Sequence, residues 1–142
     1  MAGALELSLE ADLDQLKPIR DFVAEAGRSL GVPDDIIGDL CLVVDEAVTN
    51  VILHGYRGQS GPLQIQVADE GRNLVIRIRD EASAFDANRV DSPHLDEPLA
   101  EREYGGMGVY LIRRLTDEAI FRSLPGGGNE LRLVRRDVVP TS

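Results

Sequence analysis

Glu46 and Asn50 lie four residues apart in the segment DEAVTNVILH, a spacing that places both side chains on one face of a helix. Both fall at the border of that helix's apolar stripe, where they could line a cleft. An asparagine offers a neutral oxygen to a hard cation such as magnesium, and a glutamate can accept the proton of an attacking hydroxyl. Taken alone, the pair is a weak signal, and an ordinary polar helix flank is the favoured interpretation.

Asp80 and a cluster of glycines add two further candidate sites. Asp80 ends the apolar–polar alternation of LVIRIRD; an acid there is commonly a turn former or a helix cap. The alternative is a buried acceptor for an exocyclic amine such as that of adenine. Gly105, Gly106 and Gly108 directly precede the helical pattern VYLIRRL, where glycines allow close approach to an anion and the helix start supplies N–H groups. A hinge or a close helix–sheet contact is the other interpretation.

The remaining polar candidates carry weaker signals. The glycines at 126–128 lie between two predicted strands, which favours a hairpin turn, and Asn129 just beyond them could point toward a ligand. His54 is interpreted as a packed or capping residue, and His94 has no partner cluster. The sequence shows no Cys/His spacing typical of a metal site and no Ser-His-Asp arrangement.

These candidates depend on the elements that position them. Apolar residues at every second position predict strands at 5–10, 63–67, 74–79, 119–124 and 130–135. The helical period predicts helices at 13–30, 34–54 and 106–117. Residues 87–104 show no sustained period, and a segment of this length in a small domain is usually functional, often a lid. We expect an α/β (α+β) two-layer sandwich, with about three helices on one face of a mostly antiparallel, mixed sheet.

Composition limits the classes of function. The chain has 142 residues and a formal net charge of −10, which predicts one domain over 1–142. Such an acidic surface repels nucleic acids and anionic lipids, so we expect neither as a partner. Cys41 is the only cysteine, which excludes an internal disulfide. The first residues, MAGALELSLEADL, show no signal-peptide pattern, and we expect a cytoplasmic protein.

The order of these motifs is more specific than any one of them. DEAVTNVILHGY, then a strand ending at DEASAFD, then GGMGVYLIRRLTDE and a late glycine turn resemble the GHKL (Bergerat-fold) ATPase superfamily. The resemblance covers essentially the whole chain and is closest to stand-alone anti-sigma factor serine/threonine kinases. It implies a Bergerat ATP-binding fold, with ATP and magnesium as cofactors.

The resemblance also implies roles for individual residues. Glu46 would be the general base and Asn50 the magnesium ligand. Asp80 would bind the adenine amine, with Asn129 nearby, and the phosphates would be held by Gly105, Gly106 and Gly108. Residues 87–104 would form the ATP lid, with Arg102 either contacting phosphate or lying solvated on the surface.

The chain departs from the family pattern at three positions. The family usually has Asp-x-Gly-x-Gly after the strand, but Ala82 and Ala84 take the glycine positions. If Ala82 needed a positive φ or lay against the base, its methyl group would weaken nucleotide binding. Asn129 stands where a threonine is usual, and its amide can still bond to Asp80, either directly or through water.

The resemblance predicts a protein kinase that phosphorylates a STAS-type anti-sigma antagonist and sequesters a sigma factor, in a partner-switching pathway. A homodimer is also implied, with Cys41, Leu42 and Leu53 as either core or interface. Two alternatives stay open. One is a non-catalytic Bergerat-fold interaction module, suggested by Ala82 and Ala84; the other is a detached histidine-kinase ATPase module acting on a separate phosphoacceptor.

Overall fold

The structure is a computed structural model that describes residues 4–83 and 106–140. Its strands are β1 (Leu5–Ala11), β2 (Gly61–Glu70), β3 (Asn73–Asp80), β4 (Glu118–Ser123) and β5 (Asn129–Arg135). Its helices are α1 (Leu16–Ser29), α2 (Asp34–Asn50) and α3 (Gly106–Arg114), with a 3-10 turn at Leu13–Gln15 and a π-helical turn at Val51–Gly55. No helix in these described ranges is long and apolar enough to cross a membrane.

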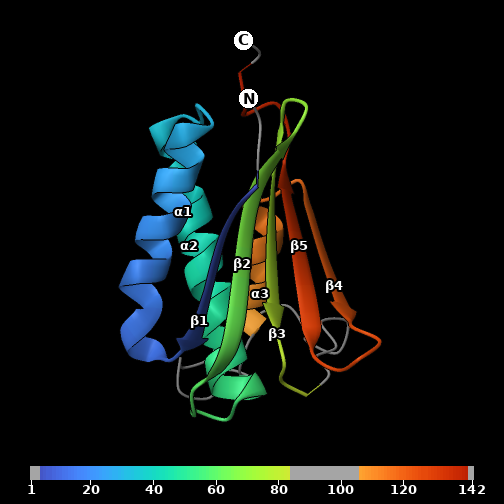
Figure 1. Ribbon diagram of the computed structural model, residues 1–142. Helices are drawn as coiled ribbons and strands as arrows, with labels where there is room; N and C mark the ends of the chain where they lie inside the picture. The colour runs from blue at the N-terminus through green and yellow to red at the C-terminus, as the bar shows by residue number, and fades with distance from the viewer. Residues whose placement is uncertain (1–3, 84–105, 141–142) are drawn as a thin grey trace, which may run out of the picture.

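The strands form one sheet in the order β1-β2-β3-β5-β4, and all three helices cover the same face of it (Figure 1). This arrangement confirms the predicted two-layer α+β architecture. Each of the four pairings between described strands is antiparallel, so the parallel component expected for a mixed sheet is not found among them. All five predicted strands are present, with ends that differ by a few residues at most.

The core forms where the alternating apolar residues of the sheet meet the helices. Ile65 of β2 pairs with Ile78 of β3, which in turn pairs with Leu131 of β5, and all three side chains are buried. The side chains between them on each strand face the other side of the sheet and are mostly polar or charged. The helix-facing layer is therefore continuous across the three central strands.

The helix α2 is the centre of the helical layer, packed between α1, α3 and the sheet. Five apolar residues recur at the helical period in this segment and predict its core stripe: Ile36, Leu40, Val43, Ala47 and Val51. Leu40, Val43 and Ala47 are buried, as predicted, whereas Ile36 and Val51 are only half-buried. The stripe is wider than one helix face, because a central helix contacts neighbours on several sides. Its outward face is left open.

The exposure of Leu42 and Leu53 decides whether these two residues belong to the core. Leu42 and Leu53 are 42% and 36% exposed, so neither belongs to the core, while Cys41 is half-buried. An interface role for these residues stays a prediction.

The second predicted helix runs close to its expected end, but its geometry changes after Asn50. Residues Val51–Gly55 form a π-helical turn, and the N–H of Tyr56 donates to the carbonyl of Val51 at 2.8 Å. Such a widened turn is rare and occurs frequently at functional sites. Here it brings Gly55 beside Ala82, directly after β3.

Candidate functional site

Asp80 and Asn129 meet at the ends of two neighbouring strands. They are paired residues of β3 and β5, both are buried, and the Asn129 amide donates to Asp80 Oδ1 at 2.9 Å. The backbone N–H of Ala82 donates to the same oxygen, also at 2.9 Å. Among the described residues none hydrogen-bonds with Asp80 Oδ2, which leaves a buried acceptor available to a ligand.

The Asn129 amide also holds the turn that follows β3. Its Nδ2 lies 3.0 Å from the Ser83 carbonyl and 3.4 Å from that of Ala82. The bond between this amide and Asp80 is direct, and the same amide contacts the carbonyls of Ala82 and Ser83. An amide NH₂ group has two donor hydrogens and a threonine hydroxyl has one, so Asn129 can bond to Asp80 and to the turn at the same time.

Ala82 adopts an ordinary backbone conformation. Among the described residues, the non-glycine positions with positive φ are Arg57 and Asp137, so the alanine at position 82 carries no left-handed strain. Its side chain is buried against Gly55 and lines the cleft described next. Ala82 therefore adds no backbone strain, and its one effect on the cleft is the volume of its methyl group.

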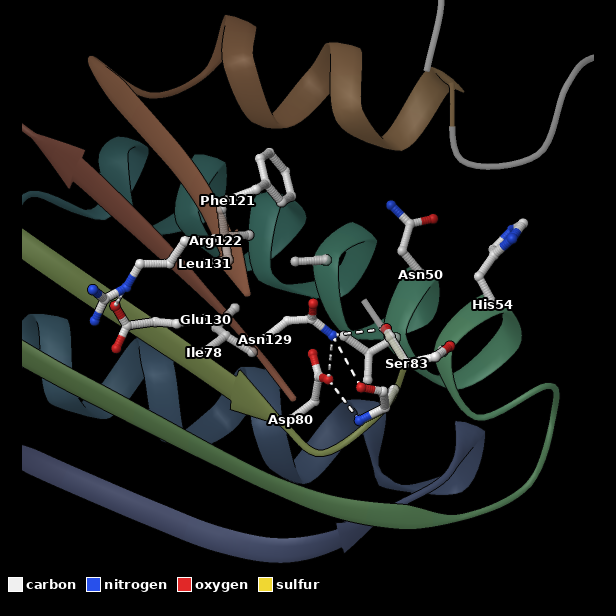
Figure 2. Close-up of a pocket in the computed structure, with 14 residues that line it drawn as sticks. Asn50, His54, Ile78, Asp80, Ser83, Phe121, Arg122, Asn129, Glu130 and Leu131 are labelled. Atoms are coloured by element: carbon white, nitrogen blue, oxygen red, sulfur yellow. Dashed lines mark hydrogen bonds and ion pairs between the residues drawn. The ribbon is translucent and has the colours of Figure 1, made fainter. Parts of the chain in front are cut away.

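A cleft of about 170 Å³ opens beside Asp80, between the end of the sheet and α2. Its apolar lining includes Ala47, Val51, Ile78, Leu131 and Phe121, and its polar lining includes Asn50, Asp80 and Asn129. In Figure 2, Asp80 and Asn129 point toward one another at the strand ends, and Asn50 extends from the end of α2 toward α3. Apolar walls with a few polar groups at one end are typical of a small-ligand site.

His54 lines the same cleft from the π-helical turn. Burial lowers the pKa of its imidazole, so the ring is mostly neutral at pH 7. This agrees with the predicted packed position, and adds a contact with the cleft that the sequence did not indicate.

Glu46, Asn50 and Gly108 come together next to the cleft, which Asn50 also lines. A Cβ built on Gly108 would lie 2.9 Å from Asn50 Nδ2 and 3.2 Å from Glu46 Oε2. The start of α3 therefore lies directly over the Glu46–Asn50 pair, and only a glycine leaves this contact unstrained. The structure thus brings three of the predicted site residues into one place, adjacent to the cleft that holds Asp80.

The carboxyl group of Glu46 is electrostatically unusual. Burial, and secondly the negative charge of Asp45, raise its pKa. Asp45 itself forms an ion pair with Arg20, with 2.8 Å between Asp45 Oδ1 and the guanidinium nitrogen. A glutamate with a raised pKa is a stronger base than an ordinary carboxylate, and pKa shifts of this kind are enriched at functional sites.

The described residues offer no ready-made protein cage for a metal. They contain no group of three or more His, Cys, Asp or Glu side chains that could hold one.

Several predicted site residues are not part of this geometry. Gly106 is the first residue of α3, as expected for a helix-start glycine. Arg102, Gly105 and the proposed lid at 87–104 lie outside the described residues, as does Ala84.

Sequence reasoning missed two residues that hold the site together. Gly128 lies in the predicted hairpin turn, which the structure confirms, with φ of +87°; a Cβ there would collide with the backbone carbonyl of Asp80. Tyr56 ends the motif DEAVTNVILHGY, whose pattern predicts no role for it, yet its hydroxyl accepts from the N–H of Glu81 at 2.7 Å. Neither role could be found without knowing which chain segments become neighbours.

Comparisons with known proteins show the family of this chain. A family model described as histidine kinase-like ATPase domain matches residues 9–135. An anti-sigma F factor from Thermoanaerobacter sp. (strain X514) is 30% identical over 116 residues, covering 82% of this chain and 81% of that protein. A serine-protein kinase RsbW from Bacillus cereus (strain AH820) is 28% identical over 118 residues, covering 80% and 74%.

A solved structure supports the fold independently. The crystal structure of the RsbU and RsbW domains of a Mycobacterium tuberculosis protein superposes with a TM-score of 0.67 and 19% identity. It covers 98% of this chain, which spans 33% of that longer protein. The matched family model and the relatives lead to one assignment: this chain belongs to the histidine kinase-like ATPase domain family.

Proposed function

We propose that this protein is an ATP-dependent serine/threonine protein kinase that acts as an anti-sigma factor and phosphorylates a STAS-type antagonist. The observation that carries the proposal is the placement of Glu46, Asn50 and Gly108 beside a cleft that ends at Asp80. One end of the site suits a purine and the other suits phosphoryl transfer. The names of the relatives, an anti-sigma F factor and the kinase RsbW, suggest the biological setting.

At the purine end, Asp80 Oδ2 is the acceptor for the adenine amine. Its partner oxygen Oδ1 is held by Asn129 and Ala82, so the carboxylate is oriented before the ligand arrives. The apolar walls at Val51, Ile78 and Leu131 suit the flat faces of the base. A hydrogen bond that the site is built to make gives specificity, because a ligand lacking the amine leaves Asp80 buried and unpaired.

At the phosphate end, the first turn of α3 faces Glu46 and Asn50 across Gly108. The helix is nine residues long, and the free N–H groups of its start, with its dipole, offset phosphate charge in an otherwise acidic protein. Asn50 would hold magnesium, which supplies charge neutralisation for the transferred group.

Glu46 completes the chemistry. It accepts the proton of the substrate's serine or threonine hydroxyl as that oxygen forms a bond to the γ-phosphorus. The bond from the γ-phosphorus to the β–γ bridging oxygen breaks, and ADP leaves. The raised pKa of Glu46 favours this proton transfer. Positioning by Asn50 and the α3 start contributes most of the remaining rate enhancement.

Partner switching follows from this chemistry. The unphosphorylated antagonist would occupy the kinase, and its phosphorylation would release the kinase to bind a sigma factor. A cytoplasmic location and a homodimer fit this role and stay predictions. The alternative of a non-catalytic module was suggested by the alanines at positions 82 and 84. One of these arguments is weakened, because Ala82 has no positive φ.

The first test is calorimetric titration of Mg·ATP into wild-type protein, Asp80→Asn and the exposed control Asp137→Asn. We expect wild type and the control to bind alike. We expect Asp80→Asn to bind at least tenfold more weakly, because an NH₂ group then faces the adenine amine. Wild-type protein that does not bind ATP would support the non-catalytic module.

The second test is transfer of labelled phosphate from ATP to a STAS-type antagonist. Glu46→Gln should reduce the rate by about 10²-fold or more, whereas the exposed control Glu25→Gln should not. Full activity in Glu46→Gln would refute the assigned base. An acid-labile, base-stable product would indicate phosphohistidine and favour the detached histidine-kinase alternative.

A further inference from the structure

Tyr56 makes an unusual set of contacts just outside the cleft. Its hydroxyl donates to the Pro62 carbonyl at 2.6 Å and accepts from the N–H of Glu81 at 2.7 Å. Its ring lies over Gly61 so closely that a side chain at that position would overlap it. Burial raises the pKa of the hydroxyl, so it stays protonated at neutral pH and can donate and accept at once.

The strand register shows what this hydroxyl replaces. In the β2–β3 pair, Leu63 is opposite Asp80, so the next position of the same register would place Pro62 opposite Glu81. In a hydrogen-bonded antiparallel pair, the N–H of one residue meets the carbonyl of the residue opposite. The Tyr56 oxygen sits between the Glu81 N–H and the Pro62 carbonyl and bonds to both. It therefore ends the ladder after Asp80 and separates the two strands.

This separation frees the chain after Asp80 to turn toward α2. Ala82 reaches Gly55, and its N–H turns back to Asp80 Oδ1. The peptide between Asp80 and Glu81 is held on both sides: Tyr56 takes its N–H, and Gly128 packs against its carbonyl. Rotation of this peptide would swing the Asp80 side chain, so the clamp fixes the direction of the carboxylate.

We propose that Tyr56 is a positioning residue for purine recognition, acting through the Glu81 N–H to aim Asp80 at the exocyclic amine. Tyr56 is not among the residues that line the cleft, so it acts without touching the ligand. The inference deepens the proposed function and rests on it for the identity of the ligand.

The experiment compares wild type, Tyr56→Phe and the control Ser29→Ala. Phenylalanine keeps the ring over Gly61 and removes only the hydroxyl. Ser29→Ala removes a hydroxyl that donates to a backbone carbonyl at 2.7 Å, at the end of α1. Each protein is titrated with Mg·ATP and with magnesium purine riboside triphosphate, which is the same nucleotide without the amine.

We expect Tyr56→Phe to lose about tenfold in affinity for ATP and less than about twofold for the analogue, because only ATP uses the aimed carboxylate. Ser29→Ala should leave both affinities unchanged. Equal losses for the two nucleotides would assign Tyr56 a general structural role and overturn the proposal. Unchanged ATP affinity in Tyr56→Phe would overturn it as well.

A second measurement needs no nucleotide and separates this inference from the proposed function. Amide hydrogen exchange at Ala82 reports the bond to Asp80 Oδ1. We expect it to become about tenfold faster or more in Tyr56→Phe and not in Ser29→Ala. Protection that is the same as in wild type would refute the clamp. If wild-type protein binds neither nucleotide, the proposed function fails, and this exchange rate still decides the role of Tyr56.

Discussion

Gly108→Ala should lower activity while changing stability little. The added methyl group would lie 2.9 Å from Asn50 Nδ2 and 3.2 Å from Glu46 Oε2, whereas ordinary contacts begin at 3.4 Å. Both neighbours are side-chain ends, so they can move away without unfolding the protein. The residues that would move are the proposed magnesium ligand and the proposed base.

The two expected contributions to the free energy of unfolding have opposite signs. Alanine is a better helix former than glycine by up to about 1 kcal/mol, which offsets the cost of moving Asn50, so the free energy of unfolding should change little. Asn50 must retreat by about 0.5 Å to restore ordinary contact. A misplacement of about 1 Å can cost roughly 10²-fold in rate, so we expect at least about a tenfold fall in phosphate transfer.

The matched control is Gly38→Ala, in the exposed part of α2, where an added Cβ meets nothing within 4 Å. It should raise stability by up to about 1 kcal/mol and leave activity unchanged. Urea unfolding and the rate of labelled phosphate transfer, measured on the same preparations, provide both readouts. Wild-type activity in Gly108→Ala would refute the contact between α3 and the Glu46–Asn50 pair. A parallel loss of stability and activity would refute the separation.

Three further predictions concern the surroundings of the site. Glu130, 3% exposed, bonds to Arg79 and Arg122 at 2.7 and 3.0 Å; burial alone would raise its pKa, but the two arginines lower it. Glu130→Gln should therefore cost about 1–3 kcal/mol in urea unfolding near pH 7, against little for the more exposed Glu118→Gln. Because the folded pKa lies below the unfolded one, that deficit should shrink as pH falls through the folded value, and a constant deficit would contradict the assignment. Asp45→Asn should lower the pKa of Glu46 and move the acid limb of the pH–rate profile to lower pH; an unmoved limb would dissociate that limb from Glu46. Gly127→Ala should lower the free energy of unfolding by about 1 kcal/mol, because residue 127 has a positive φ. Gly128→Ala should lower it clearly more and also weaken ATP binding, because its methyl group would displace the Asp80 backbone. Equal losses of stability in the two variants would count against that contact.

Local patterns were sufficient for the elements of this fold. Five alternating apolar runs became five strands, and three helical patterns became α1, α2 and α3, because each pattern has one face to bury. The pairing of Glu46 with Asn50 was also predictable, since helical spacing alone sets it. The proximity of Asp80 to Asn129 was suggested by the family resemblance, and the strand register provides its physical basis.

The contacts that depend on tertiary geometry were beyond the sequence. The π-helical turn after Asn50 cannot be distinguished from an α-helix by the apolar period, yet it determines where Gly55 and Tyr56 lie. The position of Gly108 over Asn50 depends on how α3 crosses α2. The bridging role of Tyr56 depends on a strand register that no local pattern fixes to within one residue.

Ala82 shows how such contacts change the interpretation of a sequence departure. Judged from the sequence, an alanine in place of the usual glycine implies strain or a blocked site. In the structure its φ is ordinary, and its methyl group lies where a Cβ on Gly55 would come within 2.7 Å. The methyl group fits because Gly55, which faces it, has no side chain. The same alanine presents its N–H to Asp80 Oδ1, and this bond orients the acceptor. The departure at position 82 therefore adds no backbone strain to the proposed purine end of the site, and a difference in nucleotide affinity would come from the volume of one methyl group in the cleft.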